Sequence, residues 1–133
     1  MKKILLAYDG GEPAKRALEQ TIELARRFEA SVGVISVVPV RSGRAPIDPW
    51  DDRTVHAEEL LEARKALREA GIEAEMLEPG GDVARTIERV ADERGYDTIV
   101  IGTRGLGSLT RVLQGSVSEH VATHAHATVV IAR

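Results

Sequence analysis

The chain has 133 residues, a formal net charge of −3 at neutral pH, 43% hydrophobic residues and only 3% aromatic residues. This length predicts one domain, residues 1–133, with a core of Val, Ile, Leu and Ala. The acidic balance argues against a nucleic-acid partner, which needs a clustered basic face. The chain has no cysteine, which excludes disulfides and thiolate chemistry, and no apolar run approaches the ~20 residues of a membrane span. We therefore expect a soluble, cytoplasmic protein without a membrane partner.

Two kinds of hydrophobic periodicity alternate along the first third of the chain. Residues 4–8 form a short apolar run that predicts a buried strand, and residues 13–28 follow with apolar side chains at helical spacing. Pro13 suits the first turn of that helix. Residues 32–38 predict a second strand, and the three prolines within residues 39–52 indicate a long loop.

The same alternation continues to the end of the chain. Residues 52–70 predict a helix, residues 72–77 an exposed or edge strand, and residues 81–94 a helix capped by Asp82. Residues 98–101 predict a strand, residues 109–125 a helix and residues 128–132 the last strand. The buried stripe expected on the second helix comprises Val55, Leu60, Leu61, Ala63 and Leu67.

Five strands alternating with four helices predict an α/β fold. Such alternation builds a parallel sheet with helices on both faces and right-handed crossovers, in a Rossmann-like arrangement. In open sheets of this kind, ligands bind beyond the carboxyl ends of the strands. The turns that follow the first and fourth strands are therefore the places to look for a site.

A glycine-rich segment, GTRGLGSLTRVLQGS, follows the fourth strand at residues 102–116. Gly102, Gly105, Gly115 and Ser116 stand at fixed spacing where a strand passes into a helix. Glycines let backbone N–H groups approach an anion, and a helix N-terminus adds partial positive charge. The segment therefore favours a phosphate site, although turn formation and packing would also account for these glycines.

The sequence lacks the Walker P-loop, the dinucleotide-binding fingerprint and the metalloprotease motif. The glycine-rich segment holds no lysine, so it is not a Walker P-loop, and no G-x-G-x-x-G follows the first strand. Arg104 or Arg111 could replace the lysine in part, but either is equally well explained as a solvated arginine. His120 and His124 are one helical turn apart without the glutamate of a metalloprotease motif. We expect no catalytic residue and no metal held by the protein alone.

The spacing G-x2-G-x9-G-S, together with KILLAYDG at residues 3–10, resembles the ATP-binding branch of the universal stress protein family. The resemblance also includes residues 32–39, 95–102 and 127–131. Two departures are visible. Asp9-Gly10-Gly11 stands where many members have Asp-Gly-Ser, and Ser36 stands where a histidine is frequent.

The resemblance implies the strand order 3-2-1-4-5 and a crevice that binds ATP, with Mg²⁺ or Mn²⁺. It implies that the backbone near Gly102 and Gly105, beside Arg104, cradles ribose and phosphates. It further implies that Gly115, Ser116 and Val117 wrap the terminal phosphates.

The opposite wall of the implied crevice comes from the first two strands. The backbone of Val37 would read the adenine ring, and Ala7 would line the same pocket. Asp9 would accept from the ribose or the adenine or bind the cation, although Asp-Gly is also a common turn pair.

The function implied is a nucleotide-responsive regulatory module of the stress response, with at most slow ATP hydrolysis or autophosphorylation. In the implied strand order, residues 128–132 form an apolar sheet edge without proline, which favours a homodimer. The alternatives are a dimeric interaction protein of the same fold that binds no nucleotide, and a slow ATPase.

Overall fold

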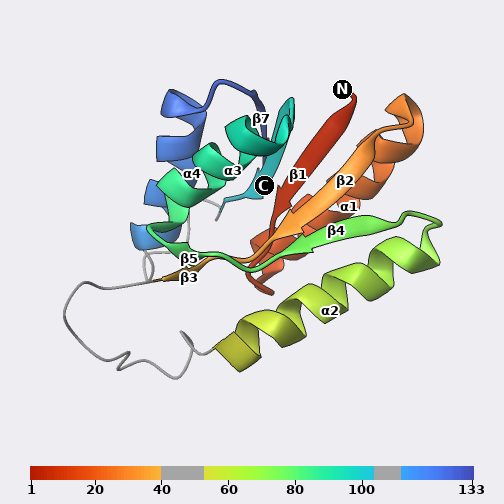
Figure 1. The fold of residues 1–133 in the computed structure, drawn as a ribbon, viewed down its shortest axis with the longest axis horizontal. Helices are drawn as coiled ribbons and strands as arrows, with labels where there is room; N and C mark the ends of the chain where they lie inside the picture. Colours follow the sequence, from red (N-terminus) through yellow and green to blue (C-terminus); the bar gives the residue numbers. More distant parts are fainter. Residues whose placement is uncertain (40–52, 104–111) are drawn as a thin grey trace.

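The computed structural model describes residues 1–39, 53–103 and 112–133 (Figure 1). The four helices and the five predicted strands occur in the predicted order, and two short strands that were not predicted, β3 and β5, are added to them. The described elements are β1 Lys3–Ala7, α1 Glu12–Phe28, β2 Ser31–Ile35, β3 Val38–Pro39, α2 Arg53–Glu69, β4 Ala74–Leu77, β5 Gly80–Gly81, α3 Val83–Arg94, β6 Thr98–Gly102, α4 Val112–His124 and β7 Thr128–Ala132.

The main sheet has five strands in the order β4-β2-β1-β6-β7, and every neighbouring pair is parallel. Counting only these five strands along the chain, the order is 3-2-1-4-5, which confirms the predicted fold class. The strands β3 and β5 pair in parallel as a separate two-stranded sheet. β1 therefore lies at the centre. The strands that follow it in the sequence are added first on one side, as β2 and β4, and then on the other side, as β6 and β7.

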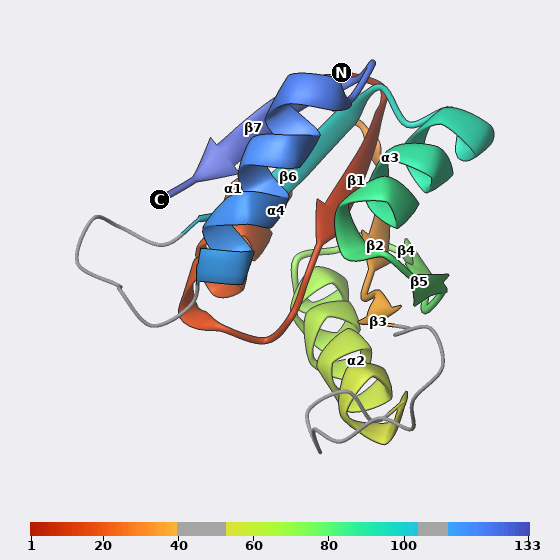
Figure 2. The same cartoon turned by 90° about the vertical axis from the view of Figure 1, so that its left-hand side faces the viewer.

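Helices cover both faces of the sheet (Figures 1 and 2). Helices α1 and α2 pack on one face through Ala17, Ala63 and Leu67, against Leu6 and Val34 of the strands. Helices α3 and α4 pack on the other face, against the intervening strand residues. Successive side chains of a strand point to opposite faces, so each central strand is buried on both sides, as expected for a parallel sheet. None of the described helices is long and apolar enough to cross a membrane.

Two sequence predictions need correction. β2 ends at Ile35 instead of residue 38. Its neighbouring strand β1 ends at Ala7, and the chain then turns away from the sheet at Gly10, whose φ of +78° is left-handed. Leu61 was expected in the buried stripe of α2 but is 61% exposed. The predicted Asp82 cap is confirmed, since its carboxylate accepts from the Arg85 N–H at 3.1 Å.

Gly33 in β2 is required by close packing. A Cβ at this position would overlap the hydroxyl of Tyr96, which is buried and donates to Glu75 Oε1 at 3.0 Å. Burial and that hydrogen bond raise the pKa of the Tyr96 hydroxyl, so it stays protonated as a donor.

We predict that Gly33→Ala lowers the melting temperature by several degrees, because overpacking a core costs about 1–3 kcal/mol. Thermal unfolding of Gly33→Ala, Tyr96→Ala and the double variant measures the effect. The double variant should lose less stability than the sum of the singles, since removing the ring makes room for the methyl group. Additive losses would contradict this packing.

Candidate functional site

The carboxyl ends of the three central strands meet at one edge of the sheet. Ala7, the last residue of β1, is in register with Ile35 of β2, and Leu6 is in register with Val100 of β6. Asp9 follows β1 by two residues. The structure thus brings the predicted residues Ala7, Asp9, Val37 and Gly102 to the same edge.

The peptide groups of Val37 lie between β2 and β3, where the backbone partners alternate. Ile35 C=O accepts from Tyr8 N–H on the β1 side at 2.9 Å, and Ser36 N–H donates to Leu77 C=O on the β4 side at 3.0 Å. Val38 N–H then donates to Pro79 C=O at 2.9 Å. By this alternation the N–H and C=O of Val37 face the β1 side, beyond the point where β1 ends. Among the backbone hydrogen bonds of the described residues, none uses either group of Val37.

Asp9 shapes the turn that leads from β1 into α1. Its Oδ1 accepts from the Gly11 N–H at 2.9 Å, and Gly10 between them is left-handed. Gly11 is the N-cap residue of α1 and supplies no side-chain cap, as its place in the sequence predicts. Asp9 therefore stabilises this turn, which was one of the two explanations for its place in the sequence.

Gly102, the last residue of β6, contacts the first turn of α1. A Cβ at Gly102 would overlap the carbonyl group of Pro13. The fold itself therefore requires glycine here, so this residue alone is no evidence of a phosphate.

The helix that follows β6 carries three more predicted residues. Gly115 is the fourth residue of α4, Ser116 comes next, and Val117 packs against the core cluster on the α3 and α4 face. Ser118 Oγ lies 3.3 Å from Thr103 Oγ1, which joins α4 to the end of β6. Arg104, Gly105 and Arg111 lie outside the described residues.

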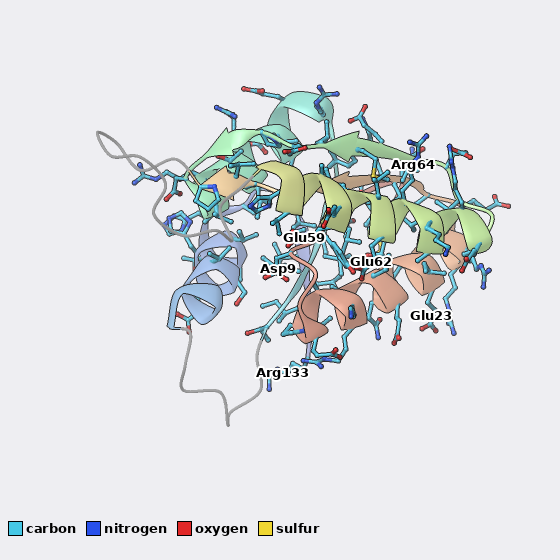
Figure 3. The ribbon with its side chains drawn as sticks, turned by 90° about the horizontal axis from the view of Figure 1, so that it is seen from below. Asp9, Glu23, Glu59, Glu62, Arg64 and Arg133 are labelled. Atoms are coloured by element: carbon cyan, nitrogen blue, oxygen red, sulfur yellow. The ribbon has the colours of Figure 1, made fainter. Side chains whose placement is uncertain are left out.

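A group of polar side chains from α2, which the sequence analysis did not single out, lies beside this edge (Figure 3). Figure 3 shows Asp9, Glu59 and Glu62 gathered between α1 and α2. The Cγ of Glu59 comes within 3.1 Å of the position that a Cβ on Gly10 would take. Burial, and secondly the nearby Asp9 carboxylate, raise the pKa of Glu59 to about 7.

Buried hydrogen bonds connect this group to the strands. The hydroxyl of Tyr8 donates to Glu62 Oε1 at 2.6 Å. Ser36 Oγ is 2.6 Å from His56 Nδ1 and donates to Glu59 Oε2 at 3.4 Å. The one sequence signal for this arrangement was Ser36, which stands where a histidine is frequent in the family that the chain resembles. In the structure, the Ser36 hydroxyl contacts a histidine of α2, His56.

The histidines of the last helix make separate contacts. His120 Nδ1 lies 2.8 Å from Glu88 Oε2, and the rings of His120 and His124 stack with centroids 4.1 Å apart. His126 Nδ1 lies 3.1 Å from Asp92 Oδ2. Within residues 1–39, 53–103 and 112–133, no three His, Asp or Glu side chains are grouped so that they could hold a metal ion. These histidines connect α4 and its C-terminal end to α3.

The strand order, with helices on both faces of the sheet, defines a doubly wound α/β protein of the Rossmann-like class. The model of the universal stress protein family matches residues 1–133. A universal stress protein of Methanocaldococcus jannaschii is 33% identical over 141 residues, covering 99% of this chain and 82% of that protein. The chain therefore belongs to the universal stress protein family.

Two solved structures from Archaeoglobus fulgidus are similar over the whole chain. One is a universal stress protein that is 26% identical with a TM-score of 0.80, covering 100% of this chain and 94% of that one. The other is a universal stress protein in complex with dAMP, also 26% identical, with a TM-score of 0.78 and coverage of 100% and 98%. The latter protein binds an adenine nucleotide.

Glu59 gives a prediction for stability against pH. Its pKa rises from 4.5 to about 7 in the folded protein, so the protonated side chain favours folding. That stabilisation is complete below about pH 4.5 and is lost as the pH rises through about 7. We expect Glu59→Gln to stabilise the protein at pH 8 by on the order of 1–3 kcal/mol relative to the unchanged chain, and to have little effect at pH 4.

Denaturant unfolding at both pH values measures this difference. Glu58→Gln, at an exposed neighbouring position on α2, is the matched control and should change stability little at either pH. A Glu59→Gln effect of equal size at pH 4 and pH 8 would show that the carboxyl is not titrating in this range.

Proposed function

We propose that this protein binds ATP at the carboxyl edge formed by β1, β2 and β6 and acts as a nucleotide-responsive binding module. The observation that carries the proposal is the Val37 peptide, whose N–H and C=O face the space beyond the end of β1. A donor and an acceptor on one residue match the adenine edge, where a ring nitrogen accepts and the exocyclic amine donates. Guanine presents an acceptor in place of that amine and would face the Val37 C=O unfavourably.

The phosphate end would lie at the start of α4. The first four N–H groups of a helix have no acceptor within it, and Gly115 is the fourth residue of α4. Backbone N–H groups and the helix dipole together attract phosphate oxygens. We assign Gly102, Gly105, Gly115, Ser116 and Val117 to this end, with Arg104 beside them. A Mg²⁺ or Mn²⁺ ion would be held mainly by the phosphate oxygens, and Asp9, on the side of the base, would accept from the ribose or the adenine.

Two further arguments support adenine and a regulatory role. The relative from Archaeoglobus fulgidus binds dAMP, which shares the adenine base with ATP. The glycine-rich segment lacks the Walker lysine that stabilises phosphoryl transfer, so nucleotide occupancy, and not turnover, is the expected signal.

The first test removes the Val37 donor. We expect Val37→Pro to weaken ATP binding at least about tenfold, because losing one hydrogen bond costs roughly 1–1.5 kcal/mol and the partner atom of the base is left unsatisfied. Calorimetric titration with ATP and Mg²⁺ gives the affinity, and the same titration with GTP should show weaker binding to the unchanged protein.

Val37→Ala is the matched control, since it keeps the N–H and removes only part of a buried side chain. It should bind ATP more tightly than Val37→Pro does. The proposal fails if the unchanged protein does not bind ATP, or if Val37→Pro binds it as tightly as the unchanged protein.

We also propose a homodimer through β7. β7 is the last strand of the sheet, with β6 as its one partner among the described strands, and Ile131 on it is 38% exposed. A hollow of about 300 Å³ lies alongside, lined by Arg16, Glu19 and Gln20 of α1 and by residues 130–133. An apolar edge strand with unpaired backbone groups favours antiparallel pairing with a second copy about a two-fold axis.

Ile131→Lys tests this interface. Val129 packs partly into the core, so the exposed Ile131 is the better position for an added charge. Two lysines facing each other across the axis should raise the dissociation constant of the dimer at least about tenfold, by roughly 1.4 kcal/mol or more. Light scattering over a micromolar dilution series measures it. Leu61→Lys, at an exposed apolar position on α2, is the control; a monomeric unchanged protein, or equal dimerisation of both variants, would refute the interface.

A further inference from the structure

The hydrogen bond between Ser36 and His56 joins the end of β2 to the beginning of α2. The two side chains are buried, with 1% and 8% of the residue surface exposed. Ser36 Oγ and His56 Nδ1 are 2.6 Å apart, and the residues are 20 positions apart in the chain. His56 is the fourth residue of α2, so this bond anchors the first turn of that helix.

Ser36 Oγ contacts two side chains of α2. It lies 2.6 Å from His56 Nδ1, and it donates to Glu59 Oε2 at the longer distance of 3.4 Å. The shorter contact, with His56, is the stronger of the two. His56 Nε2 is buried and has no partner among the described residues, so the strong contact of this ring is the one with Ser36.

Ser36, the residue before Val37, is fixed through both its backbone and its side chain. Its backbone N–H is held by Leu77 of β4, and its side chain is held by His56 of α2. Val37 has no ladder bond of its own among the described residues to fix its peptide. The direction in which the Val37 N–H and C=O point is therefore set by its neighbours, Ser36 on one side and Val38, bonded to Pro79, on the other.

We propose that His56 and Ser36 are positioning residues for the nucleotide base: their buried hydrogen bond holds the Val37 peptide in the orientation that selects adenine over guanine. The proposal rests on the proposed function, because it presumes that Val37 reads the base. A hydrogen bond that tolerates displacements of only a few tenths of an ångström discriminates between bases only if the backbone carrying it is held still. Neither His56 nor Ser36 needs to touch the nucleotide.

The experiment compares two replacements of the same histidine. The amide nitrogen of asparagine occupies nearly the place of a histidine Nδ1, whereas that of glutamine reaches nearly the place of Nε2. We expect His56→Asn to keep the ratio of ATP to GTP affinity within about threefold of the unchanged protein. His56→Gln and Ser36→Ala should each lower the ratio at least about fivefold, through weaker ATP binding with GTP binding little changed. The double variant His56→Gln with Ser36→Ala should be no worse than the poorer single variant, since one bond is lost in all three.

Titrations with ATP and GTP, with thermal unfolding of each variant, separate the outcomes. A loss of both nucleotides by the same factor would overturn the proposal, since it would show general damage to the fold. So would equal ratios in His56→Asn and His56→Gln. If all these variants bind like the unchanged protein while Val37→Pro does not, the inference fails and the proposed function stands. If the unchanged protein does not bind ATP, the proposed function fails, and the inference with it.

Discussion

The parallel pairing of β1 with both β2 and β6 is the constraint on which the rest of the structure depends. Both neighbours run in the same direction as β1, so each connection must cross over one face of the sheet and return by a helix. The helices of these crossovers, α1 and α3, lie on opposite faces of the sheet, and in sheets wound this way ligands bind at the carboxyl ends of the strands. Ala7, Asp9, Val37 and Gly102 lie at this edge because of that topology.

The contact between Gly102 and Pro13 shows how the fold limits what a motif can prove. Gly102 is the first glycine of the glycine-rich segment, and phosphate binding would explain it. The carbonyl group of Pro13 is nevertheless sufficient to exclude a side chain at this position. A substitution at Gly102 would displace α1 before it affected a nucleotide. The Val37 peptide is better evidence because neither its N–H nor its C=O has a backbone hydrogen-bond partner among the described residues.

Much of the fold could be predicted because the relevant signals are local. Runs of branched aliphatics mark the strands, and Pro13 and Asp82 mark helix starts at the expected places. Leu61 was placed wrongly because helical spacing gives a stripe but not the tilt of the helix on the sheet. Of the site, Asp9 and Val37 could be placed at a strand edge, whereas His56 and Glu59 could not. They approach β2 from a helix that begins at Arg53, and no spacing rule connects residues 36 and 56.

The charges around the edge are arranged asymmetrically, and this asymmetry sets a direction for any nucleotide bound there. Asp9, Glu59 and Glu62 gather on the α1 and α2 side (Figure 3), where a polyphosphate would meet like charge. The start of α4, near the end of β6, offers helix N–H groups and the positive end of a helix dipole. Under the proposed function the phosphates therefore point toward α4, and the uncharged base is left for Val37 beside the carboxyl groups.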